Sequence, residues 1–163
     1  MNTEKKFRPS KRFEKLTFKE RQGKYVVDTS VLAQKGLSKL VRRGLRGNII
    51  IPDAVIAELE HAANIGKEVG FKGLDEITAC HKLKHFIKIK FLGPRPAADQ
   101  IKFARFGEID AIVRELAFKN KAVLITSDLV QAKSASAYRV KVLFVPVKRE
   151  EAEKPKRFLF WKK

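Results

Sequence analysis

The sequence contains one cysteine, Cys80, and one tryptophan, Trp161. A single thiol cannot form an intrachain disulfide, which excludes a disulfide-stapled secreted domain and favours a reducing, cytoplasmic setting. The sequence also lacks any apolar run of the roughly 18 residues that a membrane-spanning helix needs. The basic stretch over residues 1–10 has no apolar segment behind it, unlike a secretory signal. We therefore expect a protein without a membrane segment.

Acidic residues are scarce. The chain carries 18 Asp and Glu against 36 Lys and Arg, a formal net charge of +18. Residues 25–146 alone hold 20 basic and 12 acidic side chains, so the excess is not confined to the two ends. A polyanionic partner is the natural interpretation, with nucleic acid ahead of a membrane surface. The alternative is a charge that only keeps a basic protein in solution.

Short apolar runs alternate along the chain with amphipathic segments. Its length of 163 residues fits one domain with extensions. We expect a basic extension over 1–23, a domain over 24–146 and a charged tail or linker over 147–163. Within the domain, the patterns predict strands at 24–28, 48–51, 86–92, 122–126 and 140–146, and helices at 29–45, 52–65, 74–85, 101–106, 107–119 and 128–138.

This order predicts a parallel sheet covered by helices on both faces, a three-layer α/β/α domain. The strand at 86–92 alternates apolar residues with lysine, which places it at or near an edge of the sheet. We interpret Gly66, Gly70 and Gly73 as turn residues between helices.

Two acidic residues follow buried strands. Asp28 ends the first strand, and Asp128 lies two residues beyond the strand that ends at Thr126. In open parallel sheets, sites form outside the carboxyl ends of the strands. Each residue could instead be an ordinary helix N-cap.

Two helices carry further acids at the borders of their apolar stripes. One helix has Glu58 on one border and Glu60 on the other, and a later helix has Asp110 and Glu108 in the same relation. Periodicity does not choose between the members of either pair, and all four could be surface charges. If acids from several elements meet, they would favour a hard divalent cation such as Mg²⁺ or Mn²⁺. Such a cation activates water and neutralises charge on a phosphodiester.

Four segments together resemble the PIN domain, in order and spacing. They are YVVDTSVL (25–32), IIIPDAVIAELE (49–60), GEIDAIVRELA (107–117) and AVLITSDLVQA (122–132). The resemblance implies a sheet of strand order 3-2-1-4-5 and a metal-dependent nuclease, usually one that cuts RNA. It assigns the catalytic acids to Asp28, Glu58, Asp110 and Asp128, of which Asp28, Asp110 and Asp128 would bind the metal. Supporting polar groups fall on Thr29, Ser30, Thr126 and Ser127; many members have Asn at the last of these positions.

A narrower resemblance involves NIGKEVGFKGLDEI (64–77) and FLGPRPAADQIKFARFGEIDAIVRE (91–115). These segments look like the N-terminal PIN domain of archaeal PIN–ATPase–KH proteins, which implies ATPase and KH domains in a longer parent chain. The present sequence has no GxxxxGK[ST] phosphate loop. Family members often dimerise or form rings, so a homo-oligomer is a further expectation.

Other side chains have weaker patterns. Arg95, Lys102 and Arg105 precede Asp110 and could contact a bound strand, or could be plain surface charge. His81 and His85 are spaced like two groups on one helix face, but Lys82 stands where a zinc protease motif needs Glu. The leading hypothesis is a Mg²⁺- or Mn²⁺-dependent nuclease that cuts single-stranded RNA or DNA. The alternative is a catalytically weak nucleic-acid-binding or assembly module.

Overall fold

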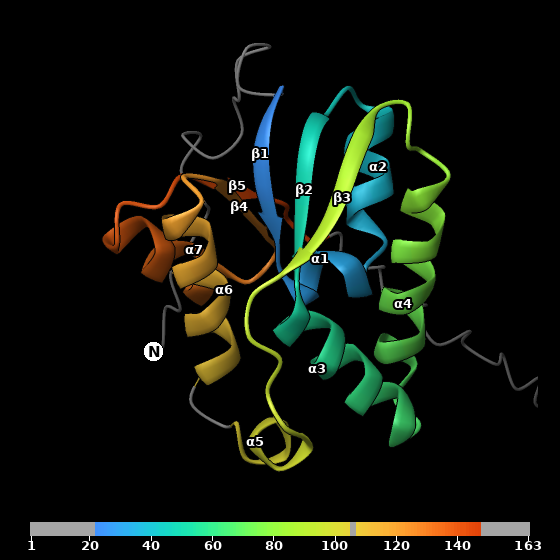
Figure 1. Cartoon of the computed structure of the whole chain (residues 1–163), viewed down its shortest axis with the longest axis vertical. Coiled ribbons are helices and arrows are strands. Elements are labelled where there is room, and N and C mark those ends of the chain that lie inside the picture. Colours follow the sequence, from blue (N-terminus) through green and yellow to red (C-terminus); the bar gives the residue numbers. More distant parts are fainter. Residues whose placement is uncertain (1–21, 105–106, 148–163) are drawn as a thin grey trace, which may run out of the picture.

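Five parallel strands form one sheet in the order β3-β2-β1-β4-β5. The structure is a computed structural model and describes residues 22–104 and 107–147. The strands are β1 (Gln22–Val27), β2 (Arg46–Pro52), β3 (Ile87–Leu92), β4 (Val123–Thr126) and β5 (Val142–Phe144) (Figure 1). The expected α/β class, the strand order and the edge position of β3 are therefore confirmed.

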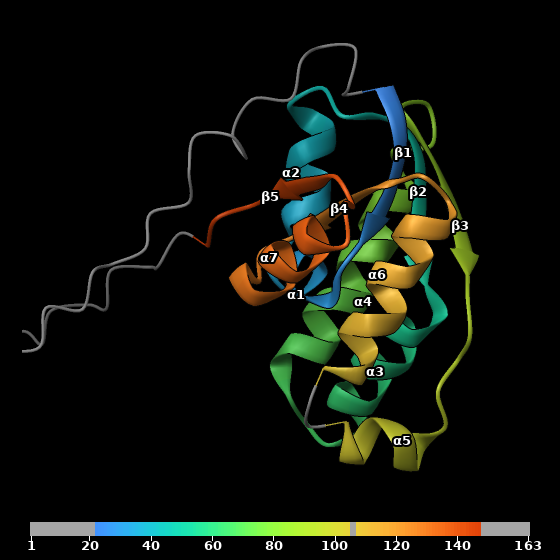
Figure 2. The same ribbon diagram turned by 90° about the vertical axis from the view of Figure 1, so that its left-hand side faces the viewer.

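Helices cover the two faces of this sheet unequally. They are α1 (Thr29–Ala33), α2 (Gly36–Arg42), α3 (Asp53–Asn64), α4 (Glu68–His81), α5 (Ala98–Phe103), α6 (Glu108–Lys119) and α7 (Leu129–Ala137). Figures 1 and 2 show α1, α2 and α4 on one face and α6 on the other, where α6 packs on β1 and β4. None of the helices within residues 22–104 and 107–147 is long and apolar enough to cross a membrane.

The core is densest around the central strands. Tyr25, Val26 and Val27 of β1 and Leu124 and Ile125 of β4 have no exposed surface. Consecutive apolar residues are buried because β1 and β4 are covered on both sides, as expected for a parallel sheet. All five strands are parallel and end at the same edge of the sheet, so the residues that follow the neighbouring strands β1 and β4 lie side by side.

The single helix expected over residues 29–45 is wrong. α1 ends at Ala33, and α2 begins only at Gly36, after Lys35 adopts a left-handed φ of 54°. A Cβ on Gly36 would lie 3.0 Å from Cγ1 of Val31, so the chain turns closely back on itself there. Both short helices bury apolar side chains, which is why the spacing looked continuous.

The interpretation of Gly70 and Gly73 as turn residues is also wrong, because both lie inside α4. A Cβ on Gly70 would lie 2.3 Å from the backbone nitrogen of Ala63, and one on Gly73 would lie 2.4 Å from Cδ2 of Leu59. The glycines therefore let α4 pack against α3 almost backbone to backbone. α4 begins at Glu68, six residues before the expected start, and ends at His81, so His85 does not share a helix face with His81.

Candidate active site

Asp28 lies at the carboxyl end of β1 and is only 3% exposed. Its Oδ1 accepts a hydrogen bond from the backbone N–H of Thr29 (2.9 Å), and its Oδ2 accepts from the hydroxyls of Ser30 and Thr126 (both 2.8 Å). Thr126 is within reach because β4 pairs with β1 and ends at this residue. Burial raises the pKa of Asp28, while these hydrogen bonds oppose the rise.

Glu58 reaches the same place from α3. Its carboxylate accepts a hydrogen bond from the hydroxyl of Thr29, the residue next to Asp28. Burial raises the pKa of Glu58, the charge of Asp28 adds to the rise, and the Thr29 hydroxyl opposes it. Glu60 instead forms a surface ion pair with Arg95. The structure thus places Glu58, and not Glu60, beside Asp28, in agreement with the choice implied by the family resemblance.

Asp110 comes from the first turn of α6. Its pKa is raised to about 6, first by burial and then by the charges of Asp28, Asp128 and Glu58, while Arg114 opposes the rise. Four carboxylates from four different elements therefore lie within electrostatic reach of one another. We call Asp28, Glu58, Asp110 and Asp128 the acid cluster.

Asp128 is exposed and is the N-cap of α7. Its Oδ1 accepts from the backbone N–H groups of Val130 (2.7 Å) and Gln131 (3.2 Å). Asp28 likewise caps α1. Asp28 and Asp128 therefore cap helices and also belong to the acid cluster, two roles that the sequence left as alternatives. Both roles are possible because α1 and α7 begin where β1 and β4 end, at the same edge of the sheet.

Ser127 precedes Asp128 and is 9% exposed. Its backbone N–H donates to the Ser30 hydroxyl at 2.9 Å. The Ser127 hydroxyl itself has no hydrogen-bond partner within the described part of the chain. Thr29, Ser30 and Thr126 thus contact the acids directly, whereas Ser127 does so only through Ser30.

Gln131 is a site residue that the sequence analysis missed. It is 1% exposed, its Oε1 accepts from Nη1 of Arg114 at 2.9 Å, and its Nε2 donates to the backbone carbonyl of Asp110 at 3.0 Å. Arg114 also lies over the ring of Tyr138, 5.5 Å from its centre. The one local signal was a polar side chain three residues after Asp128, and nothing nearby indicated that it faces inward.

The acid cluster fits a hard divalent cation in its donor chemistry. It offers carboxylate oxygens alone. Burial first, and then repulsion among the acids, raises the pKa of Asp110, and a bound cation would relieve that repulsion. Within residues 22–104 and 107–147, no three or more Asp, Glu, His or Cys side chains are already arranged to hold a metal ion. Glu58 is directed to Thr29, and Asp128 to the start of α7. The donors are therefore of the right kind and close, but not preassembled as a coordination shell.

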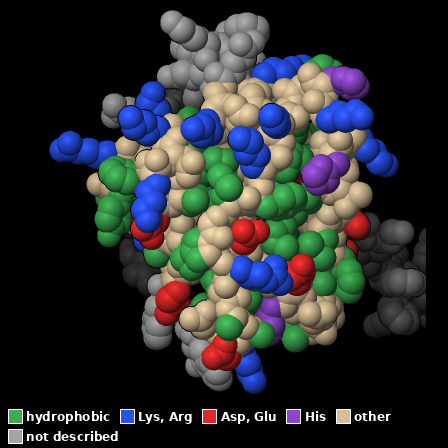
Figure 3. Space-filling model, in the orientation of Figure 1, with side chains coloured by type: hydrophobic (Ala, Val, Ile, Leu, Met, Phe, Trp, Pro, Cys, Tyr) green, Lys and Arg blue, Asp and Glu red, His purple; other side chains and the backbone are tan. Residues whose placement is uncertain are grey.

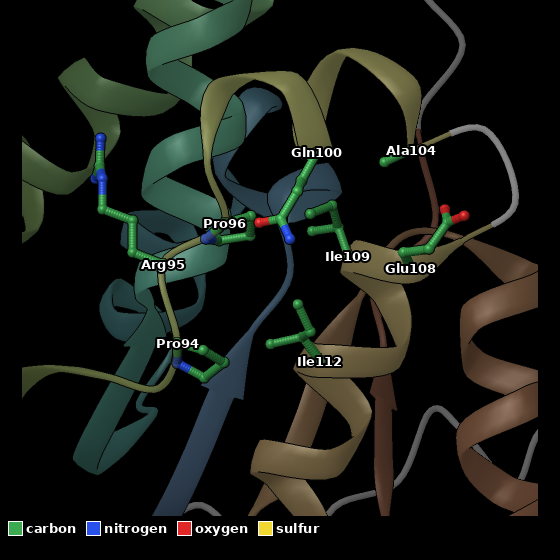
Figure 4. Close-up of a pocket in the computed structure, with 8 residues that line it drawn as sticks. All are labelled: Pro94, Arg95, Pro96, Gln100, Ala104, Glu108, Ile109 and Ile112. Atoms are coloured by element: carbon green, nitrogen blue, oxygen red, sulfur yellow. The ribbon is translucent and has the colours of Figure 1, made fainter.

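A pocket of about 450 Å³ lies between α6 and the segment that follows β3 (Figure 4). Its walls include Pro94, Pro96, Ile109 and Ile112. Glu108, Ile109 and Ile112 share one side of α6, and at 3.6 residues per turn Asp110 projects roughly 150° away from the middle of that side. The pocket and the acid cluster therefore lie on opposite sides of the first turn of α6.

The basic residues expected to contact a strand have different environments. Arg95 points away from the pocket in Figure 4 and pairs with Glu60. Lys102 is exposed on α5. Arg105 lies outside the described residues.

Two comparisons relate this chain to known proteins. The chain is 38% identical over 134 residues, 80% of its length, to an uncharacterized KH and PIN-domain containing protein of Methanocaldococcus jannaschii, and it spans only 21% of that relative. A solved structure, a domain of a functionally unknown protein from the same organism, superposes with a TM-score of 0.73 at 38% identity. That match covers 81% of this chain and 97% of the solved one.

The sequence also matches the PIN domain family over residues 25–136, the span that contains all four members of the acid cluster. PIN domains are in general metal-dependent nucleases, and they usually bind divalent metals. The match covers most of the chain and agrees with the strand order of the sheet. The chain therefore belongs to the PIN domain family.

Proposed function

We propose that this chain is a Mg²⁺- or Mn²⁺-dependent nuclease that hydrolyses single-stranded nucleic acid, with RNA as the preferred substrate. The observation that carries the proposal is the meeting of four carboxylates from different elements at one edge of the sheet, where burial and the other three acids raise the pKa of Asp110. A cluster of acids with perturbed pKa values at the carboxyl edge of a parallel sheet is characteristic of a functional site. The family supplies the reaction class.

The proposed roles follow from the positions of the side chains. Asp28, Asp110 and Asp128 would hold the metal through carboxylate oxygens. Glu58 would complete the set or accept a proton from the attacking water at its carboxylate. When bound, the cation would lower the pKa of a water and neutralise charge that develops on the phosphodiester. The hydroxyls of Ser30 and Thr126 keep Asp28 fixed, because both donate to its Oδ2.

The test is cleavage of end-labelled single-stranded RNA and DNA with Mn²⁺, Mg²⁺ or EDTA. Glu58→Gln and Asp110→Asn should each lower the rate about 100-fold or more, a magnitude typical of lost acid–base or electrostatic catalysis. Their controls are Glu60→Gln and Glu108→Gln, which remove neighbouring carboxylates on the same helices but outside the cluster. We expect these two controls to cut at close to the wild-type rate.

Asp28→Asn should abolish metal-dependent cutting while the far-ultraviolet circular dichroism spectrum stays unchanged. If Asp28→Asn cuts at the wild-type rate, the assignment of the acid cluster is wrong. If neither protein cuts and both bind the oligonucleotide equally, the chain is a binding or assembly module of a longer protein. The relative of M. jannaschii, of which the chain spans 21% and which has a KH domain by name, is the reason to keep that outcome in view.

A further inference from the structure

Three neighbouring strands of the sheet carry basic residues but no acids. Their sequences are QGKYVV in β1, RGNIIIP in β2 and IKIKFL in β3. They contain Lys24, Arg46, Lys88 and Lys90 and not one Asp or Glu. The side chains of these three strands therefore carry positive charge only.

The register of the sheet brings the lysines together. Lys24, Asn48 and Lys88 are partners in one row across β1, β2 and β3, and Lys90 belongs to the row two residues further along β3. Paired residues of parallel strands, and residues two apart in one strand, point to the same face. All four side chains are exposed. We call Lys24, Asn48, Lys88 and Lys90 the lysine face.

No helix within the described part of the chain covers this face. α1, α2 and α4 pack on the opposite side of the sheet, and α6 packs on β1 and β4, away from β3. Figure 3 views the uncovered side and shows Lys and Arg side chains gathered over its upper half, with Asp and Glu lower down. Val26 and Ile50, which share a row with Lys90, are buried. The open part of this face is therefore Lys24 of β1, Asn48 of β2 and the edge strand β3. Parallel sheets are ordinarily buried on both faces, and this exposed edge is free to contact a ligand.

The lysines also lack partners among the described residues. Among residues 22–104 and 107–147, the ammonium groups of Lys24, Lys88 and Lys90 have no hydrogen bond or ion pair. Adjacent strands are about 4.8 Å apart and residues rise about 3.3 Å, so Lys24 and Lys88 lie about 10 Å apart and Lys88 and Lys90 about 7 Å. These separations are similar to the screening length of about 8 Å at physiological salt, so the charges reinforce one another and attract a polyanion.

We propose that the lysine face binds the sugar–phosphate backbone of the single strand on which the acid cluster acts. Lys88 and Lys90 would engage neighbouring phosphates along β3, Lys24 a third, and the amide of Asn48 would donate a hydrogen bond between them. This proposal rests on the proposed nuclease function for the identity of the ligand. Lysines predominate between Phe86 and Leu92, two exposed apolar residues at the ends of this row along β3. This concentration of positive charge fits a contact with phosphates better than a protein interface, whose core is depleted of charge.

The position of the face suits this role. β3 leads from the lysine face into Pro94 and Pro96 of the pocket, and the far wall of the pocket is the first turn of α6. The same turn carries Asp110 on its other side. A strand that leaves the lysine face at the carboxyl end of β3 can therefore reach the acid cluster by passing around the start of α6. The face would bind without regard to base sequence, because phosphates carry none.

The test is equilibrium binding of a fluorescent single-stranded oligonucleotide in EDTA, where no cutting occurs, across a series of salt concentrations. The test variant is Lys88→Gln/Lys90→Gln. Its control is Lys39→Gln/Lys67→Gln, which removes the same charge from exposed positions on α2 and just before α4, on the opposite side of the sheet. Thermal unfolding of both variants checks that the fold is kept.

We expect the test variant to bind about tenfold more weakly at moderate salt. The slope of log K against log salt should fall in magnitude by about 1.4, since each phosphate contact with a single strand contributes about 0.7. The control should keep the wild-type slope. The proposal would be overturned if the two variants lost the same affinity for the oligonucleotide, if neither lost affinity, or if the wild type did not bind.

Cleavage assays separate this inference from the proposed function. If the wild type cuts but the two double variants bind the oligonucleotide equally well, the proposal for the lysine face is wrong and the nuclease assignment stands. If the wild type never cuts but only the Lys88/Lys90 pair weakens binding, the nuclease assignment fails and the lysine face stands as a nucleic-acid-binding surface.

Discussion

The side-chain amide of Gln131 in α7 donates from Nε2 to the backbone carbonyl of Asp110 in α6, at 3.0 Å. The same amide accepts from Arg114 through Oε1, so one fully buried group joins the two helices that supply Asp110 and Asp128. Arg114 in turn is the cation that opposes the rise in the pKa of Asp110. The spacing of two cluster acids therefore depends on a residue outside the cluster.

Replacing Gln131 with Leu should lower the free energy of unfolding by about 1–3 kcal/mol, because it leaves the buried partner groups unsatisfied. The control is Gln34→Leu, an exposed glutamine at the end of α1, where we expect a change within about 0.5 kcal/mol. Urea unfolding measures both. A loss no larger than the control would show that the amide does not hold α6 and α7 together.

Asp110 should make the metal-free protein less stable as pH rises. Its pKa is about 6 in the folded protein against 3.8 ordinarily. Between these values the folded state binds more protons than the unfolded state, so the free energy of unfolding falls with increasing pH. Asp110→Asn should therefore be more stable than the wild type at neutral pH and equal to it below about pH 4.

A shift of this size corresponds to about 3 kcal/mol for a group shielded from water. Because Asp110 is only half-buried, solvent screening reduces the expected gain to about 1 kcal/mol. The control is Asp75→Asn, which removes an exposed carboxylate from α4 and should change stability little at either pH. If Asp110→Asn is not more stable than wild type at neutral pH, the acids do not repel one another as described.

Divalent cations should stabilise the wild type but not Asp28→Asn. A ligand that binds the folded state alone, at 100 times its dissociation constant, adds about 2.7 kcal/mol. Thermal unfolding with Mn²⁺, Mg²⁺ or EDTA measures the shift. Glu68→Gln, which removes an exposed carboxylate paired with Lys72, should respond like the wild type. A similar response from Asp28→Asn would place the cation elsewhere.

Glu76 should support the fold and not the acid cluster. It is 2% exposed and accepts from the backbone N–H (2.6 Å) and the hydroxyl (3.1 Å) of Ser38 in the first turn of α2. Glu76→Ala should lower the free energy of unfolding by about 3 kcal/mol, because it leaves the Ser38 N–H without its acceptor and opens a cavity.

Glu76→Gln retains one acceptor oxygen, so its free energy of unfolding should fall much less than that of Glu76→Ala. Mn²⁺ should still stabilise both variants by the wild-type amount, as thermal unfolding would measure. Loss of that response in Glu76→Gln would mean that Glu76 takes part in metal binding.

Gly70→Ala should destabilise the protein although alanine favours helices. The exchange gains about 1 kcal/mol in helix propensity. The new methyl group, however, would lie 2.3 Å from the backbone nitrogen of Ala63, and such overpacking costs about 1–3 kcal/mol or more. We expect a net loss of about 2 kcal/mol by chemical denaturation, whereas Thr78→Ala on the exposed side of α4 should be nearly neutral. A stabilised Gly70→Ala would contradict the close packing of α3 and α4.

The sequence by itself determined the order of strands and helices, because the fully apolar runs of β1, β2 and β4 can be buried only in the middle of a parallel sheet. It also placed Asp28 and Asp128 at one edge, since Asp28 ends one such run and Asp128 lies two residues beyond another. Strand order came from the family resemblance, which the sheet confirms. Local patterns failed at Lys35 and at Gly70 and Gly73, where the chain depends on contacts with Val31, Leu59 and Ala63 that are invisible in a local window.

Periodicity could not decide between the paired acids; the family resemblance implied Glu58 and Asp110, and the folded structure places these two beside the other acids. Glu58 and Glu60 border the same apolar stripe, as do Asp110 and Glu108, so periodicity treats the members of each pair as equivalent. The choice depends on what lies opposite each border: Thr29 and Asp28 beside Glu58, Arg95 beside Glu60, the other acids beside Asp110 and the pocket beside Glu108. Gln131 and the lysine face likewise arise from helix packing and strand register. These features involve residues that are distant in the chain, so they can be recognised only in the folded structure.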